Sequence, residues 1–196
     1  VAIAAYAAML WLEAASMAEV PVGEALPAVQ SVLAATHYGF AWMIGASALV
    51  VVAICSSTDP APQAVGTVQF VRIAALGVLL YSRSMVSHAG AGGDFSWAVT
   101  IDWVHLVLIS IWLGEVLVAG LITLRRSPGA KSRERIEHAR YIEALSQSAT
   151  IALVGIFATG AASAWRGLGS LENATGNPYA TTLLIKLGLV VTAAGL

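Results

Sequence analysis

The feature that most constrains this chain is a succession of long apolar segments, separated by short breaks rich in proline and glycine. A helix that crosses a bilayer needs about 20 predominantly apolar residues. Six segments reach or approach that length: Val1 to Ala18, Ala28 to Cys55, Ala64 to His88, Trp97 to Leu124, Tyr141 to Leu168 and Tyr179 to Leu196. The sequence therefore predicts an all-α fold, a polytopic transmembrane helix bundle with six spans in a single domain that covers residues 1–196.

Composition points the same way and excludes other classes of protein. Hydrophobic residues make up 58% of the chain and charged residues 11%, whereas a soluble domain carries about 25% charged residues. The lipid bilayer is therefore the expected partner. A net charge of −1 lacks the basic excess that nucleic-acid binding needs, so no nucleic acid is expected. The chain starts at Val1 and stops inside an apolar run at Leu196, so we expect it to be part of a longer protein.

Orientation follows from the basic residues. Six of the ten lysines and arginines lie between residues 125 and 140. The positive-inside rule places this loop in the cytoplasm, and alternation then places the segment of residues 90–96 outside. His138 lies among these charges and is expected to be a solvated surface residue.

Three histidines fall inside or at the end of predicted spans: His37, His88 and His105. Counted from the outer ends of their helices, all three lie in the outer half of the bilayer. Ionisable side chains in a span are costly and are functional candidates by default. Three imidazoles at similar depth on three helices are what a metal site or a haem would need. The alternative for each is a hydrogen bond between helices.

The neighbours of these histidines indicate a metal. Met85 precedes His88 by three residues, which in a helix puts both on one face, with a thioether one turn below an imidazole. Imidazole suits several transition metals, whereas thioether selects Cu(I). Asp102 precedes His105 by one turn and is predicted to accept a hydrogen bond from that ring, which would fix its tautomer.

Other charges in the spans are interpreted structurally. Arg72 and Glu115 lie at equal depth from the cytoplasmic ends of consecutive helices, so they are predicted to form an ion pair, with a role in an ion pathway as the alternative. Arg83 could bind a carboxylate, a haem propionate or a helix end.

Small residues recur every four positions on the predicted fifth span. Such a stripe lets two helices approach closely in lipid. Its members are Gly155, Thr159, Ser163 and Gly167.

The second half of the chain resembles the CopD/PcoD copper resistance D family. The stretch from Trp165 to Gly195 contains a glycine-serine-leucine segment, a proline-tyrosine turn at Pro178-Tyr179, and a leucine-rich helix with an embedded lysine, Lys186. The sequences SHA, from Ser87, and DWVHLVLISIWLGEVLVAGL, from Asp102, are similar to the family's histidine-containing helices. The resemblance covers about residues 87–195.

The chain departs from the family pattern at three positions. Asn177 and Ala180 replace a usual threonine and glycine, and Glu115 stands where a glycine is common.

The resemblance implies a copper-handling protein of the bacterial inner membrane, often found alongside a periplasmic copper-binding protein. The family has about eight spans, so two further helices would follow Leu196. It also implies that His88 and His105 are the family's histidines.

The leading hypothesis is a copper transport or resistance protein that takes copper from the periplasmic side, with His88, His105 and Met85 as ligands and His37 as a third imidazole. One alternative is a b-type haem electron carrier with two axial histidines, and another is a non-catalytic subunit of a larger membrane complex. No enzyme is expected, because the sequence has no nucleophile motif, carboxylate pair or nucleotide loop.

Overall fold

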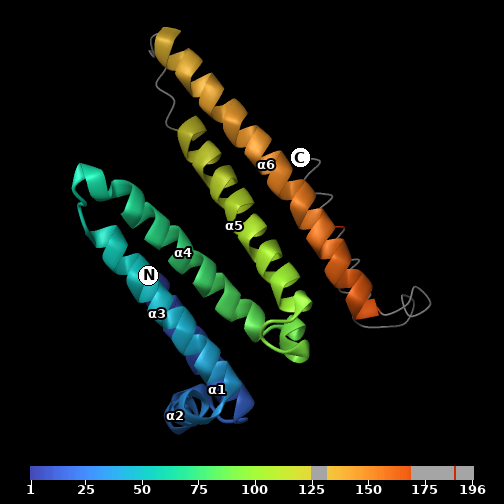
Figure 1. The fold of residues 1–196 in the computed structure, drawn as a ribbon. Helices are drawn as coiled ribbons and strands as arrows, with labels where there is room; N and C mark the ends of the chain where they lie inside the picture. The colour runs from blue at the N-terminus through green and yellow to red at the C-terminus, as the bar shows by residue number, and fades with distance from the viewer. Residues whose placement is uncertain (125–131, 169–187, 189–196) are drawn as a thin grey trace. The chain divides into compact units, whose positions relative to one another are not determined.

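The computed structural model describes residues 1–124, 132–168 and 188, and within these it is all-α, as predicted (Figure 1). The long helices are α3, α4, α5 and α6, and shorter helices precede or separate them. In chain order the elements are α1 (Ala2–Met17), η1 (Val22–Glu24), α2 (Leu26–Ala35), α3 (His37–Ser57), η2 (Pro62–Ala64), α4 (Val65–Met85), η3 (His88–Gly92), α5 (Trp97–Leu124) and α6 (Ser132–Leu168).

Four stretches are long and apolar enough to cross a membrane: His37–Ser57, Pro62–Met85, Trp97–Leu121 and Arg140–Arg166. They correspond to the second to fifth predicted spans. The first predicted span is α1, whose 16 residues are short for a crossing. The sixth, Tyr179 to Leu196, lies outside the described residues.

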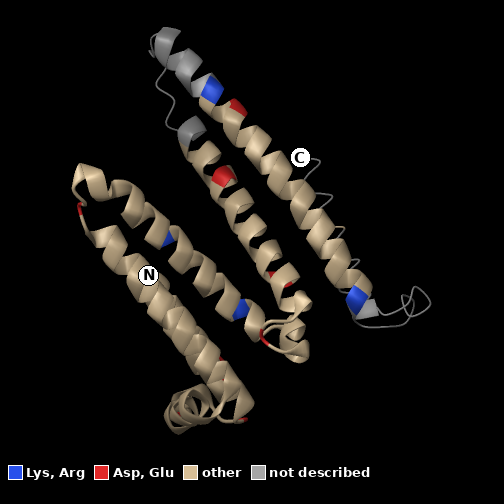
Figure 2. Cartoon of the chain, in the orientation of Figure 1, with Lys and Arg blue, Asp and Glu red and all other residues tan. Residues whose placement is uncertain are grey.

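The stretches long enough to cross a membrane carry few charges (Figure 2) and turn large apolar side chains outward. Phe70 is 71% exposed, Ile73 67% and Ile151 73%. Surfaces of this kind are covered by lipid in a membrane protein, because water would penalise so much exposed hydrocarbon. The chain is therefore a membrane protein with transmembrane helices.

The chain forms two compact units, Val1–Trp103 and Val104–Leu196. Two apolar clusters make the core of the first unit: one joins α1 and α2, and the other joins α3, α4 and the start of α5. Their buried members are Leu10, Ala14 and Val32 in the first cluster, and Ala41, Met85 and Val99 in the second. In the second unit, α5 and α6 meet where a Cβ on Gly155 would come 2.6 Å from Leu108 Cδ1.

The second predicted span, Ala28 to Cys55, is confirmed from His37 onward, but its predicted start is wrong because the helix breaks at Thr36. The backbone of Thr36 is extended, with φ −118° and ψ 152°. Its hydroxyl accepts a hydrogen bond from Gly39 N at 3.0 Å and donates to Val32 O at 2.7 Å. The side chain thereby caps the start of α3 and the end of α2, as threonine does at helix ends. His37 consequently begins α3 and does not lie ten residues inside a span.

Gly39 explains why the two helices can meet so closely at this break. A Cβ at this position would overlap the backbone carbonyl oxygen of Val32 and lie 2.7 Å from Leu33 Cα. Only glycine leaves room for such a backbone contact.

Two further boundaries differ from the prediction. The third span ends at Met85 and not at His88, because Ser87 caps the short helix η3 by accepting from Ala89 N. Helix α6, which contains the fifth predicted span, begins at Ser132, so the predicted basic loop of residues 125–140 is helical from that residue on. Its stretch long and apolar enough to cross a membrane, Arg140–Arg166, agrees with the predicted start at Tyr141.

Candidate functional site

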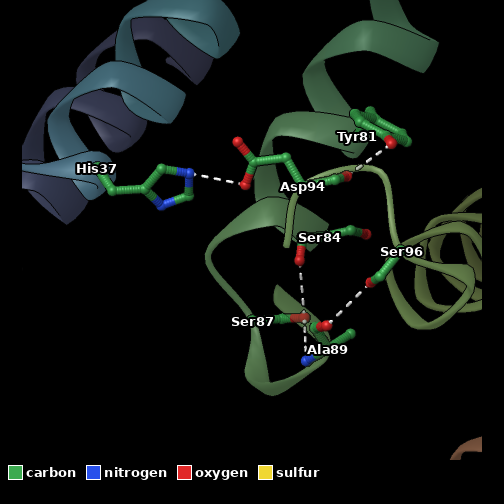
Figure 3. Close-up of polar contacts among 7 residues, drawn as sticks. All are labelled: His37, Tyr81, Ser84, Ser87, Ala89, Asp94 and Ser96. Atoms are coloured by element: carbon green, nitrogen blue, oxygen red, sulfur yellow. Dashed lines mark hydrogen bonds and ion pairs between the residues drawn. The ribbon is translucent and has the colours of Figure 1, made fainter. Parts of the chain in front are cut away.

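Polar side chains and backbone polar groups of the first unit gather where α3 begins, α4 ends and α5 begins (Figure 3). We call this group the η3 cluster, after the short helix at its centre. Its members are His37, Tyr81, Ser84, Ser87, Ala89, Asp94, Ser96 and Asp102.

The strongest contact in the η3 cluster joins His37 and Asp94. The distance from His37 Nε2 to Asp94 Oδ1 is 2.7 Å, and the two side chains are 51% and 27% exposed. The carboxylate can only accept, so Nε2 carries the proton. In a neutral ring the lone pair then lies on Nδ1, which points away from Asp94 in Figure 3.

Asp94 is itself held in place by its backbone. Its carbonyl oxygen accepts a hydrogen bond from the Tyr81 hydroxyl at 2.8 Å. The residue before it, Gly93, has φ of 98°, a left-handed conformation that glycine adopts without strain. The Tyr81 ring packs edge-on against Trp103, with centroids 5.9 Å apart. The loop is thus anchored to α4 and α5 at the residue that meets His37.

Ser87 connects the rest of the η3 cluster. Its hydroxyl accepts from Ala89 N at 3.1 Å and lies 2.9 Å from Ser84 O and 3.0 Å from Asp102 Oδ2. A hydroxyl has one proton, so it cannot fully satisfy both acceptors at once. Ser84 is fully buried, and its own hydroxyl has no hydrogen-bond partner within the described residues.

Met85 and His88, predicted to share a helical face, do not share one, because α4 ends at Met85. The thioether is packed in the apolar cluster with Ala41 and Val99, and Met85 is 6% exposed. His88 begins η3 and is exposed. Of the two predicted ligands, only the imidazole faces outward.

Arg83, on the last turn of α4, stacks over the ring of Tyr38, with 6.0 Å from the guanidinium carbon to the ring centroid. Such a cation–π contact holds the charge against α3, next to His37. It assigns Arg83 a packing role in this conformation.

His105 belongs to the second unit and is bonded to α6. Its Nδ1 lies 2.8 Å from the Thr159 hydroxyl, which donates to Gly155 O at 2.7 Å and lies 3.2 Å from Ile156 O. Because the single hydroxyl proton goes to a carbonyl, Thr159 accepts and His105 Nδ1 carries the proton. In a neutral ring the lone pair is then on Nε2. The interhelical hydrogen bond considered from the sequence is thus present for His105.

Two of the other predicted residues, Asp102 and Arg72, have partners other than those predicted. Asp102, predicted to accept from His105, lies within hydrogen-bond distance of Ser87, and its role toward His105 stays a prediction. Arg72 donates to Cys55 O at 2.7 Å, at the end of α3, and to Gln69 at 3.4 Å. Glu115 belongs to the second unit, so its ion pair with Arg72 also stays a prediction.

Within residues 1–124, 132–168 and 188, no three His, Cys, Asp or Glu side chains come together in a group that could hold a metal ion. Methionine is outside that set. The nearest approach to a metal-binding arrangement in the first unit is an imidazole with a carboxylate behind it, at His37.

Sequence reasoning missed Asp94 and Thr159 as partners of histidines. Asp94 is the only acid between residues 60 and 101, and it follows a glycine-rich turn, so it could have been noticed. Thr159 lies in the stripe of small residues that indicated a helix contact, but the stripe did not reveal which residue it would face.

No family model, curated protein or solved structure matches this chain.

Proposed function

We propose that the chain is a CopD-like membrane protein that takes up copper from the periplasmic side of the bacterial inner membrane. The observation that carries the proposal is the half-exposed His37 imidazole, bonded at one nitrogen to a carboxylate. Metal-binding histidines generally donate their second ring N–H to a carboxylate or carbonyl, which orients the ring and raises its basicity.

His88 supports the proposal by its place in the chain. It begins η3, and the loop that follows η3 carries Asp94, the partner of His37. Imidazole nitrogen is a good ligand for copper. An exposed imidazole in this part of the first unit is accessible to an ion, or to a periplasmic protein that delivers one.

Met85 enters the proposal as an internal donor. Its thioether is uncharged and soft, which favours Cu(I) over harder ions, and it is buried among apolar side chains. An ion bound first by imidazole would meet this sulfur only after moving inward, with displacement of the packing around Met85.

His105 supports a metal-ligand role in the second unit. With the proton on Nδ1 held by Thr159, the lone pair of the neutral ring is on Nε2. That is the form in which a histidine binds a metal.

The same tautomer favours one other function, b-type haem binding, since an axial histidine also coordinates iron through a ring nitrogen. Gly160 lies beside the ring: a Cβ there would be 3.6 Å from His105 Cε1. Haem binding would make the protein an electron carrier, in contrast to a copper transporter.

The test is metal analysis and an absorption spectrum of detergent-purified protein, for the wild type and the single variants His37→Ala, His88→Ala and His105→Ala. We expect copper in the wild type, less copper in each variant, and no Soret band. His138→Ala is the matched control and should keep the wild-type copper content.

A Soret band that disappears in His105→Ala would replace copper handling by haem binding. Neither copper nor a Soret band in the wild type would contradict both functions and favour a non-catalytic subunit of a larger membrane complex.

A further inference from the structure

A groove of about 490 Å³ lies between α3 and α4, which pack against each other in the first unit (Figure 1). Ala48 and Ala75 line its base and are buried, because two small facing side chains leave a depression between the helices. Larger, exposed side chains form its walls, among them Phe40, Met43 and Val78.

The lining of the groove is hydrocarbon. Ser47 is the polar member of the lining, and its hydroxyl already donates to Met43 O at 2.9 Å, on its own helix. The lining therefore has no polar group in need of a partner, and it suits an apolar ligand.

The length of the groove matches one leaflet of a bilayer. It follows α3 from Phe40 to Val51, a rise of about 16 Å at 1.5 Å per residue. The hydrocarbon core of a bilayer is about 30 Å thick, so each leaflet contributes about 15 Å of acyl chain. One acyl chain that lies along α3 would fill the groove from end to end.

Arg72 lies beyond the Val51 end of the groove. On α4 it precedes Ala75 by three residues, and its guanidinium donates to Cys55 O at 2.7 Å, four residues past Val51 on α3. Carbonyl oxygens point toward the C-terminal end of a helix, so the guanidinium lies near the last residue of α3, Ser57. A helix of 21 residues crosses the hydrocarbon core, so this end lies near the membrane surface.

The guanidinium has donors to spare. Of its five N–H groups, one bonds Cys55 O and another lies 3.4 Å from the Gln69 amide oxygen. Both acceptors are uncharged, so they do not neutralise Arg72, and Arg72 Nε has no hydrogen-bond partner among the described residues. A guanidinium binds phosphate oxygens through two parallel N–H bonds. Asp59 is the one acid between residues 25 and 93, and it is exposed, so salt and water screen its repulsion of an anion.

We infer that the groove binds one acyl chain of an anionic phospholipid and that Arg72 binds the phosphate of the same lipid. Three observations carry the inference: the apolar lining, the length of one leaflet, and a cation at the end that lies near the membrane surface. The site lies at the opposite end of α3 from His37, so it goes beyond the proposed function and does not involve copper.

The experiment is native mass spectrometry of the full chain in detergent, titrated with phosphatidylglycerol, which counts the lipids that each chain retains and gives their affinity. Phosphatidylcholine, whose choline group neutralises the phosphate, is the comparison lipid. The test variants are Arg72→Gln and Ser47→Trp. The matched controls are Arg83→Gln, at the other arginine of the first unit, and Ile73→Trp, at an α4 position that is 67% exposed and outside the groove.

We expect the wild type to retain one phosphatidylglycerol and to bind it more tightly than phosphatidylcholine. Arg72→Gln should weaken phosphatidylglycerol binding by about fivefold, as expected for the loss of one cation beside an anionic lipid, and should remove the preference between the two lipids. Ser47→Trp fills the groove from an exposed position, so circular dichroism should show an intact fold. Both lipids should then bind more weakly by roughly tenfold, the equivalent of two methylene groups left unburied. Both controls should match the wild type.

Equal phosphatidylglycerol affinity in the wild type and Arg72→Gln overturns the inference and favours Glu115, the predicted partner, as the group that neutralises Arg72. Equal affinity in the wild type and Ser47→Trp also overturns it, because the lipid would then lie outside the groove. A dimer of the wild type that Ser47→Trp dissociates would assign the groove to a second copy of the chain and overturn the inference as well. If Arg72→Gln fails to fold, Ser47→Trp still tests the groove.

Discussion

The two histidines with defined partners are held in opposite ways. His37, in the first unit, bonds through Nε2 to a carboxylate, and His105, in the second, bonds through Nδ1 to a hydroxyl. The first lies at the start of a helix and is half exposed, whereas the second lies within a predicted span against α6. In a neutral ring the lone pair would therefore be on Nδ1 at His37 and on Nε2 at His105.

The surroundings differ as much as the partners. Near His37 the tightest contact is between backbones, since a Cβ on Gly39 would overlap the Val32 carbonyl. Near His105 the corresponding contact, at Gly155, is with the end of the Leu108 side chain. A backbone cannot move aside alone, whereas a leucine can change rotamer. Substitutions that add volume should therefore destabilise the protein more near His37 than near His105.

The largest expected effect is that of Gly39→Ala. The added methyl group would push α2 from α3 and displace the capped turn that carries His37, at a cost of about 3 kcal/mol. Unfolding in mixed detergent micelles, followed by circular dichroism, would measure it. A loss below about 1 kcal/mol would show that the backbone contact is not rigid.

Gly155→Ala should cost less, about 1 kcal/mol, because Leu108 can turn away from the new methyl group. The same unfolding measurement applies. If Gly155→Ala proved as damaging as Gly39→Ala, the contrast between a backbone contact and a side-chain contact would be wrong.

Thr159→Val should have a smaller effect on stability, about 0.6 kcal/mol, typical of a hydrogen bond between transmembrane helices. The substitution keeps the shape and removes the acceptor for His105 Nδ1–H. Nitrogen NMR should then show His105 populating the other tautomer, while His37 stays unchanged. An unchanged His105 signal would mean that Thr159 does not set its tautomer.

Asp94→Asn should change stability least, by about 0.5 kcal/mol or less, since a polar contact between partly exposed side chains contributes little and asparagine keeps an oxygen acceptor. Thermal unfolding of this variant beside Asp59→Ala would test it. A large loss of stability in Asp94→Asn but not in Asp59→Ala would show that the bond between His37 and Asp94 mainly stabilises the fold.

The sequence was most informative where the physical signal is averaged over many residues. The predicted helix from Trp97 to Leu124 has the same ends in the structure, and the all-α fold follows from hydropathy. A transmembrane span consists of about 20 predominantly apolar residues, so no single residue decides whether the segment is predicted as a span.

Single-residue events could not be predicted in this way. The break at Thr36 lies inside an apolar run and depends on a cap and on the close approach at Gly39, a contact between two helices whose relative position the sequence does not specify. The prediction assumed an unbroken helix, and it therefore placed His37 inside a span and not at the start of α3. Its partner Asp94 is far away in the sequence and close only after folding.

Arg72 gives α3 a second attachment. Its guanidinium binds the Cys55 carbonyl at the far end of the helix, while His37 binds Asp94 at the near end. Sliding α3 along its axis by one turn, about 5.4 Å, would break both bonds together. Breaking the bond between His37 and Asp94 alone would leave the Arg72 bond intact, so α3 would separate from the loop that carries Asp94 and stay joined to α4 at its far end. The opening between α3 and the loop would then lie beside His37.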